Sequence, residues 1–217
     1  MFTLKIDGSA PLSAASVQTL AAVCDQAEGL PGSGVVTVHV TGTPQVGWTG
    51  GLDVALVSKW ERVLRRLERL PAPTIAVVSG DIGGAALDVF LTTDFRIAAP
   101  ESRLLVATDG EATWPGMAAF RLVQQAGAAG VRRAVLFGVP IHASQALALG
   151  IVDELADDPA DVLDATTELV GRLSGKELAI RRQLMFDATS TSFEDGLGPH
   201  LAACDRALRR VGAVEVS

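Results

Sequence analysis

The segment from Pro73 to Asp88 constrains this chain more than any other. It reads Pro-Thr-Ile-Ala-Val-Val-Ser-Gly-Asp-Ile-Gly-Gly-Ala-Ala-Leu-Asp. An apolar, β-branched run predicts a buried strand over 74–78, small residues predict a turn, and a helical pattern over 85–93 follows at once. The first N–H groups of that helix have no partner within it, so they can hold an anion or a developing oxyanion. Asp88 lies about one turn into the helix. The segment therefore predicts backbone donors beside one carboxyl group.

A second glycine turn repeats this arrangement earlier in the chain. A buried strand is predicted over 35–40, and the loop Gly47-Trp-Thr-Gly-Gly-Leu-Asp53 leads from it into a helix over 52–70. A glycine turn before a helix is by itself often only a turn. Two of them in one chain could place two backbone N–H groups on one oxygen, which a thioester enolate or a tetrahedral oxyanion requires.

The rest of the chain alternates strands with helices, which predicts an α/β fold. Further strands are expected over 2–6, 95–99, 104–107 and 151–155, and further helices over 14–28, 117–125, 130–137 and 143–149, with mostly helical structure over 159–211. Ser13 or Ser16 can cap the first helix. We expect a core over residues 1–155 and a helical C-terminal segment over 156–217 that serves oligomerisation or closes the site.

Composition excludes several classes of function. The formal net charge of −7 argues against general nucleic-acid binding. We find no apolar run of about 18 residues and no signal-peptide pattern, so we expect a cytoplasmic protein. Cys24 and Cys204 stand among apolar residues, and both are expected to be buried free thiols. His142 and His200 lack partners at metal-ligand spacing, so no metal site is predicted.

Three ordered motifs resemble the crotonase family of enoyl-CoA hydratases and isomerases. The first is Trp48-Thr-Gly-Gly-Leu-Asp53, similar to Phe-Ser-Ala-Gly-x-Asp. The second combines Pro73-Thr-Ile-Ala with Gly84-Ala-Ala, Asp88 and Asp94-Phe-Arg-Ile-Ala98. The third is Gly138-Val-Pro-Ile-His-Ala-Ser-Gln-Ala-Leu-Ala-Leu-Gly-Ile-Val152. The resemblance covers about residues 4–155 and implies a repeated ββα superhelix with a helical C-terminal segment.

The resemblance also assigns roles to residues. It implies oxyanion donors at the N–H groups of Gly50 and Ala85, and Asp88 as the catalytic acid or base. Trp48, Gly51 and Gly84 would contact the substrate, an acyl-CoA thioester. Coenzyme A is then part of the substrate, and no separate cofactor is expected. Trp48 could equally be a core anchor, and Asp88 could be a charge that the helix dipole stabilises.

The position of the second acid departs from the family. Hydratases of this family use two glutamates; the first maps to Asp88 and the second to Thr108, with Asp109 and Glu111 nearby. The helix carrying Lys59-Trp-Glu-Arg-Val-Leu-Arg-Arg-Leu-Glu-Arg69 is amphipathic. Its basic residues could meet the phosphates of coenzyme A, or form a solvated face with a Glu61–Arg65 pair.

Small, glutamate-poor members of the family occur in secondary metabolism. By resemblance, this chain would assist dehydration and aromatisation of a polyketide-derived thioester to 3,5-dihydroxyphenylacetyl-CoA in antibiotic biosynthesis. Its partners would be a type III polyketide synthase and a second crotonase homologue, and it would form a homotrimer or hexamer. Two alternatives stay open: an ordinary enoyl-CoA hydratase or isomerase, and a non-catalytic subunit that stimulates another enzyme.

Overall fold

A mostly parallel sheet forms the centre of the computed structural model, which describes residues 2–29, 34–110, 112–172 and 175–215. Strands β1 (Phe2–Asp7), β2 (Val36–Gly42), β3 (Thr74–Gly83), β4 (Phe95–Ala98) and β9 (Glu154–Leu155) lie side by side in that order, all parallel. Strand β5 (Arg103–Leu105) pairs with the end of β3 and with the short β8 (Ile141–His142). The predicted α/β class is confirmed.

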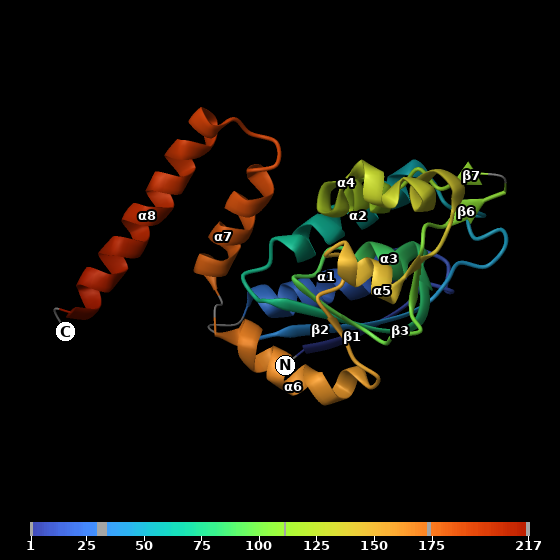
Figure 1. Cartoon of the computed structure of the whole chain (residues 1–217), viewed down its shortest axis with the longest axis horizontal. Helices are drawn as coiled ribbons and strands as arrows, with labels where there is room; N and C mark the ends of the chain where they lie inside the picture. The colour runs from blue at the N-terminus through green and yellow to red at the C-terminus, as the bar shows by residue number, and fades with distance from the viewer. Residues whose placement is uncertain (1, 30–33, 111, 173–174, 216–217) are drawn as a thin grey trace.

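Helices cover both faces of this sheet (Figure 1). On one side lie α1 (Ala14–Glu28), α2 (Val54–Glu68), α3 (Gly84–Phe90), α4 (Met117–Phe137) and α5 (Ala143–Ala148). Helix α6 (Pro159–Gly171) packs on the other side, where its apolar residues contact Ile75, Val77 and Ile97 of the sheet. Both faces of the central strands are therefore buried, which explains why β3 begins as a continuous apolar run.

The start and the buried side of helix α2 follow from its local sequence. Asp53 caps it, since its carboxylate accepts the N–H of Leu56 at 2.6 Å, so the helix begins two residues later than predicted. Its predicted apolar side, Val63, Leu64, Leu67 and Leu70, is buried, with Trp60 beside it. The predicted Glu61–Arg65 pair is wrong. Arg65 pairs with Glu68 at 2.9 Å, and Glu61 turns away from it to pair with Arg121 at 3.0 Å.

Strand β3 runs through the segment for which a turn was predicted. The turn was expected after Val78, but the strand continues to Gly83, because Asp81, Ile82 and Gly83 pair with β5. The strand therefore leads directly into α3, with Gly83 as the helix N-cap. The two helices predicted over 117–125 and 130–137 form one element, α4, with a kink at Gly127, whose φ is 72°.

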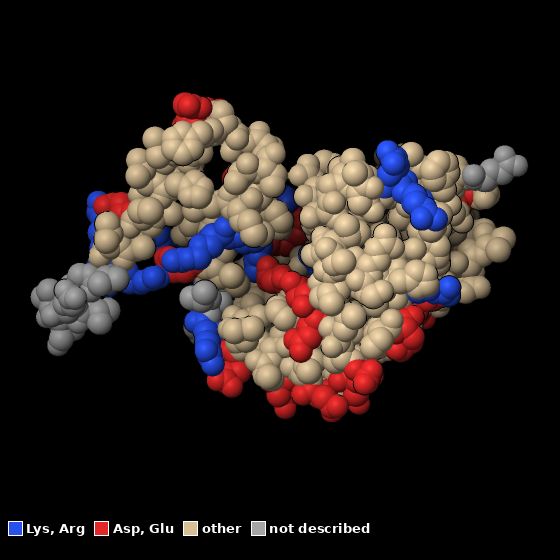
Figure 2. Space-filling view, in the orientation of Figure 1, with Lys and Arg blue, Asp and Glu red and all other residues tan. Residues whose placement is uncertain are grey.

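Of the C-terminal helices, α8 (Phe193–Glu215) extends away from the sheet, and α7 (Lys176–Asp187) lies between it and the rest of the protein (Figure 1). Cys204 lies on α8 and is exposed, so its predicted burial is wrong; its apolar neighbours in sequence have no core to enter. Cys24 is buried as predicted, and burial raises the pKa of its thiol to about 11. Basic side chains gather where α7 and α8 face the rest of the protein (Figure 2), and Glu177 pairs with Arg206 and Arg210 to join the two helices.

Candidate active site

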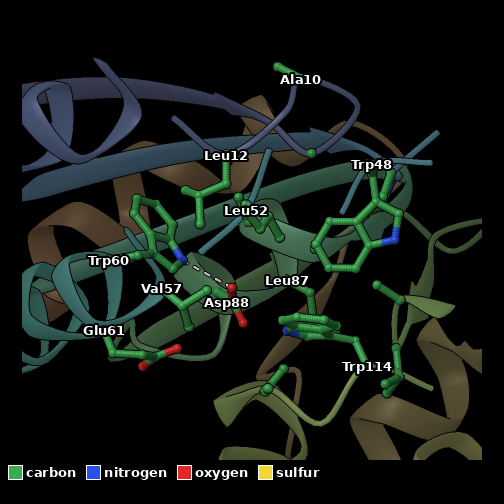
Figure 3. A pocket seen from close by; sticks show the side chains of 18 residues that line it. Ala10, Leu12, Trp48, Leu52, Val57, Trp60, Glu61, Leu87, Asp88 and Trp114 are labelled. Atoms are coloured by element: carbon green, nitrogen blue, oxygen red, sulfur yellow. Dashed lines mark hydrogen bonds between the residues drawn. The ribbon is translucent and has the colours of Figure 1, made fainter. Parts of the chain in front are cut away.

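A cavity opens where α3 begins, between α2 and the loop that precedes it (Figure 3). Its walls are mainly apolar and aromatic, and they come from six separate parts of the chain. The lining residues are Gly8, Ala10, Leu12, Pro44, Trp48, Leu52, Val57, Trp60, Glu61, Gly84, Ala85, Leu87, Asp88, Val106, Ala107, Trp114, Gly116 and Ala118. Four predicted site residues thus meet in one place: Trp48, Gly84, Ala85 and Asp88.

The start of α3 supplies backbone donors to this cavity. Gly84 and Ala85 are the first two helical residues, and the N–H groups of a helix's first turn have no acceptor within the helix. Gly84 has φ 52°, a left-handed conformation that favours glycine, and a Cβ there would lie 2.6 Å from Cγ of Pro44. Glycine at this position lets the chain turn from β3 into α3 against Pro44, and the Ala85 N–H follows directly.

We expect Gly84→Ala to destabilise the protein more than Gly80→Ala. Both positions have positive φ, so alanine costs about 1–2 kcal/mol at either. A Cβ at Gly80 meets nothing within 4 Å, whereas one at Gly84 meets Pro44 and adds about 1–3 kcal/mol. Urea unfolding of both variants measures the difference. Equal losses of stability would show that the contact with Pro44 does not matter.

Asp88 is the carboxyl group at the centre of the cavity (Figure 3). Its Oδ2 accepts a hydrogen bond from the indole Nε1 of Trp60 at 3.0 Å, and no other hydrogen bond among the described residues involves this carboxyl group. Burial among apolar side chains raises the pKa of Asp88 to about 7. The bond from Trp60 lowers this pKa, nearby Glu61 raises it, and Arg121 lowers it. A group with a pKa near neutrality can both accept and return a proton at physiological pH.

Trp60→Phe is expected to raise the pKa of Asp88 further. The indole N–H stabilises the ionised carboxylate, and phenylalanine keeps the ring but removes the donor. A hydrogen bond to a charged group contributes about 1.5–3 kcal/mol, which corresponds to about 1–2 pKa units. Titration of the Asp88 carboxyl carbon by NMR measures this shift. An unchanged or lower pKa would contradict the role assigned to Trp60.

Two tryptophans form the opposite wall. The rings of Trp48 and Trp114 meet edge to face, with centroids 5.2 Å apart. Trp48 Nε1 donates to the carbonyl of Thr108 at 2.8 Å, and the hydroxyl of Thr49 donates to Asp109 at 3.1 Å. These bonds tie the glycine loop to the hairpin of β6 (Thr108–Asp109) and β7 (Ala112–Thr113). Trp48 therefore lines the cavity rather than anchoring the core.

Gly50 does not occupy the position expected of an oxyanion donor. Its N–H donates to the carbonyl of Gly47 at 2.9 Å, because the loop folds into consecutive turns. Gly50 and Gly51 are both exposed, and neither lines the cavity. In this conformation the expected pair of donors is not assembled: of Gly50 and Ala85, only Ala85 lines the cavity.

The region expected to hold a second acid also lies outside the cavity. Thr108 and Asp109 are exposed and contact the glycine loop through the bonds described above. Glu111 lies outside the described residues. The cavity has a different second carboxyl group, Glu61, which the sequence pattern of α2 places on a solvated face. The spacing of the sequence carries one signal for Glu61. Glu61 and Glu68 are seven residues apart, which is about two helical turns, so they lie on the same side of α2 as the buried Leu64 between them.

Three arginines of α2 are engaged with neighbouring side chains in this structure. Arg66 binds Asp25 at 2.6 Å and Glu28, Arg65 binds Glu68, and Arg62 donates to Ser58 at 3.2 Å. Over the described part of the chain, no group of three or more His, Cys, Asp or Glu side chains could hold a metal ion. Within the same residues, no helix is long and apolar enough to cross a membrane.

The start of a helix and a carboxyl group of raised pKa line one apolar cavity, an arrangement suited to stabilising an oxyanion while a proton moves. Comparison with known proteins agrees with this class. Residues 49–210 match the sequence pattern of the enoyl-CoA hydratase/isomerase family, and the chain belongs to this family.

Relatives in sequence support the same family, and solved structures support the fold. The chain is 60% identical to an enoyl-CoA hydratase of Amycolatopsis orientalis over 95% of both chains. It is 26% identical to a probable enoyl-CoA hydratase of Bacillus subtilis, over 86% of this chain and 78% of the relative. A crystal structure of an enoyl-CoA hydratase from Mycobacterium smegmatis superposes with a TM-score of 0.81 at 16% identity, over 94% of this chain and 87% of the other. The predicted crotonase fold is confirmed.

Proposed function

We propose that this protein binds an acyl-CoA thioester in the cavity and stabilises its enolate. The observation that carries the proposal is the shared position of the Ala85 N–H and the Asp88 carboxyl group, which lie one helical turn apart on α3 and line the same cavity. The thioester oxygen would accept the Ala85 N–H. The Gly50 N–H would join it only after its turn bond to Gly47 opens.

Asp88 would move the proton. As a carboxylate it takes the proton from the carbon next to the thioester carbonyl, and the electron pair of that C–H bond moves into the enolate. The enolate oxygen is then held by the helix start, where the backbone dipoles favour negative charge. Carboxyl and backbone groups carry these steps, so the proposal includes no separate cofactor.

The finer proposal concerns the acyl group. We propose a polyketide-derived thioester, whose dehydration and aromatisation to 3,5-dihydroxyphenylacetyl-CoA this protein assists in antibiotic biosynthesis. Two features support it: the resemblance to small members of the family in secondary metabolism, and an aromatic wall of Trp48 and Trp114 suited to a planar ring. A type III polyketide synthase and a second crotonase homologue are the proposed protein partners.

Helix α8 supports the proposal of a homotrimer or hexamer. Phe193, Leu197, Leu201 and Leu208 recur at helical spacing along it, and all four are exposed. Apolar stripes of this kind are commonly covered by another chain.

A second candidate function is that of a non-catalytic subunit that stimulates another enzyme. The turn that engages the Gly50 N–H favours this alternative, because one expected donor is not free. An ordinary hydratase or isomerase would instead turn over crotonyl-CoA.

One experiment separates these functions. The purified chain is added to a type III polyketide synthase and malonyl-CoA, and the formation of 3,5-dihydroxyphenylacetyl-CoA is measured. We expect the chain to increase product formation, and the Asp88→Asn variant to lose this effect. Undiminished stimulation by Asp88→Asn would establish the non-catalytic role, and turnover of crotonyl-CoA without any stimulation would establish the ordinary hydratase.

A further inference from the structure

Glu61 is the second carboxyl group of the cavity. Among the described residues that line it, Asp88 and Glu61 are the ones that carry a titratable side chain. Asp88 comes from α3 and Glu61 from α2, and both side chains lie on the same side of the cavity (Figure 3). Glu61 lies near enough for its negative charge to raise the pKa of Asp88.

Each carboxyl group is held by one N–H donor and keeps one oxygen uncommitted. Trp60 donates to Oδ2 of Asp88, and Arg121 donates to Oε2 of Glu61 at 3.0 Å. Over the described part of the chain, no hydrogen bond involves Oδ1 of Asp88 or Oε1 of Glu61. Two neighbouring carboxyl groups, each with one free oxygen, can bind a water molecule or a hydroxyl group between them.

Arg121 fixes Glu61 in this position. Its guanidinium lies between Glu61 and Glu68, with Nε donating to Glu68 at 2.8 Å. The side chains of Arg121 and Glu68 are each only 8% exposed, whereas that of Glu61 is 23% exposed. Glu68 is therefore an internal counter-charge, and Glu61 is the partner that reaches the cavity.

We propose that Glu61 holds the hydroxyl group that leaves as water when the bound thioester is dehydrated. This assignment rests on the proposed function and extends it. Oε1 of Glu61 accepts a hydrogen bond from the hydroxyl group on the carbon two bonds from the thioester carbonyl, and so directs its oxygen toward Asp88. Glu61 is thus a catalytic residue that neither gains nor loses a proton over the cycle.

Asp88 carries out both proton transfers of the dehydration. Asp88 takes the proton from the carbon next to the carbonyl, and the enolate forms. The protonated Asp88 then delivers that proton to the hydroxyl oxygen as the C–O bond breaks. The electron pair of the enolate becomes the new C=C bond, water leaves, and Asp88 is again a carboxylate.

Two reactions separate the roles of the two carboxyl groups. Phenylacetyl-CoA has no hydroxyl group to lose, so exchange of its α-protons in D₂O reports enolate formation alone. Dehydration of 3-hydroxy-3-phenylpropanoyl-CoA, followed by ultraviolet absorbance, requires both groups. For Glu61→Gln we expect α-proton exchange within about threefold of wild type, and dehydration slowed by about 10²-fold through loss of a charged acceptor.

Glu68→Gln is the matched control, because it removes a carboxylate from the same Arg121 network but does not line the cavity. The glutamine oxygen can still accept the Arg121 Nε–H, so the Arg121–Glu61 bond stays in place. We expect Glu68→Gln to keep both reactions within about threefold of wild type, with circular dichroism confirming that each variant is folded. Equal loss of dehydration in the two variants, or no loss in Glu61→Gln, would overturn the assignment of Glu61. Wild-type exchange without dehydration would overturn that assignment while leaving the proposed function intact, whereas a wild type without exchange would overturn both.

Discussion

Asp88→Asn is expected to slow proton transfer by about 10²- to 10⁴-fold, the usual contribution of a positioned acid or base. Asparagine keeps the size of the side chain and can still accept the indole N–H of Trp60. It cannot take up a proton at neutral pH. Steady-state rates of dehydration, measured against wild type at pH 7, test this expectation.

The same substitution is expected to stabilise the folded protein at high pH. The folded pKa of Asp88, about 7, lies above its unfolded value of 3.8, so the folded state binds this proton more tightly. Below about pH 4 both states are protonated and the variant gains nothing. As the pH rises from 4 to 7 the wild type loses stability relative to Asp88→Asn, and the difference reaches about 2–4 kcal/mol at pH 8.

Asp81→Asn is the control for this pH dependence. Arg103 holds the pKa of Asp81 below its usual range through a hydrogen-bonded ion pair on a partly exposed surface. The pH dependence of stability therefore has the opposite sign for Asp81. The ion pair stabilises the folded protein at neutral pH, this stabilisation is lost as the pH falls, and its size is small. Urea unfolding at pH 4.5 and pH 8 compares the variants. A stabilisation by Asp88→Asn that does not grow with pH would contradict the buried carboxyl group.

Arg182→Met is expected to cost about 3 kcal/mol of stability, because it removes the positive partner of a carboxylate and a donor to two buried carbonyl groups. Arg182 anchors α7 to the sheet. Its guanidinium forms two bonds to Asp94, at 2.7 and 2.6 Å, and also donates to the carbonyls of Leu70 and Ala72. Asp94 in turn accepts the N–H and hydroxyl of Thr74, the first residue of β3.

Arg181→Met provides the matched comparison. Arg181 is the neighbouring residue on α7, and it pairs with Glu177 on the surface, so its loss should cost under about 0.5 kcal/mol. Urea midpoints with unchanged slopes measure both values. Hydrogen exchange should also show faster opening of α7 in Arg182→Met alone. Equal effects of the two substitutions would mean that the buried network does not hold the helix.

Local patterns predicted the elements that carry the site. The apolar run before Gly80, the periodicity of α2 and the motif at Asp88 are all short-range features, so strand, helix and carboxyl group were predictable from neighbouring residues. The continuation of β3 to Gly83 was not, because it depends on pairing with β5 some 20 residues later. The kink at Gly127 and the exposure of Cys204 likewise depend on tertiary packing.

The partners of the site residues were harder to predict than the residues themselves. Asp88 and Ala85 were predicted to meet, and both line the cavity. The bond from Trp60 joins residues 28 apart, and the Arg121–Glu61 pair joins residues 60 apart, with no sequence motif linking either pair. The turn that engages the Gly50 N–H could not be predicted for another reason, because a glycine loop is compatible with several turn conformations.

We propose that this cavity stabilises the enolate of an acyl-CoA thioester, with Asp88 as the proton carrier. Exchange of the α-protons of phenylacetyl-CoA in D₂O, followed by NMR at saturating thioester, tests it most directly because no product needs to be assumed. We expect exchange well above the uncatalysed rate with wild type, and a loss of about 10²-fold or more in Asp88→Asn. Absence of exchange with wild type, or undiminished exchange with Asp88→Asn, would contradict it.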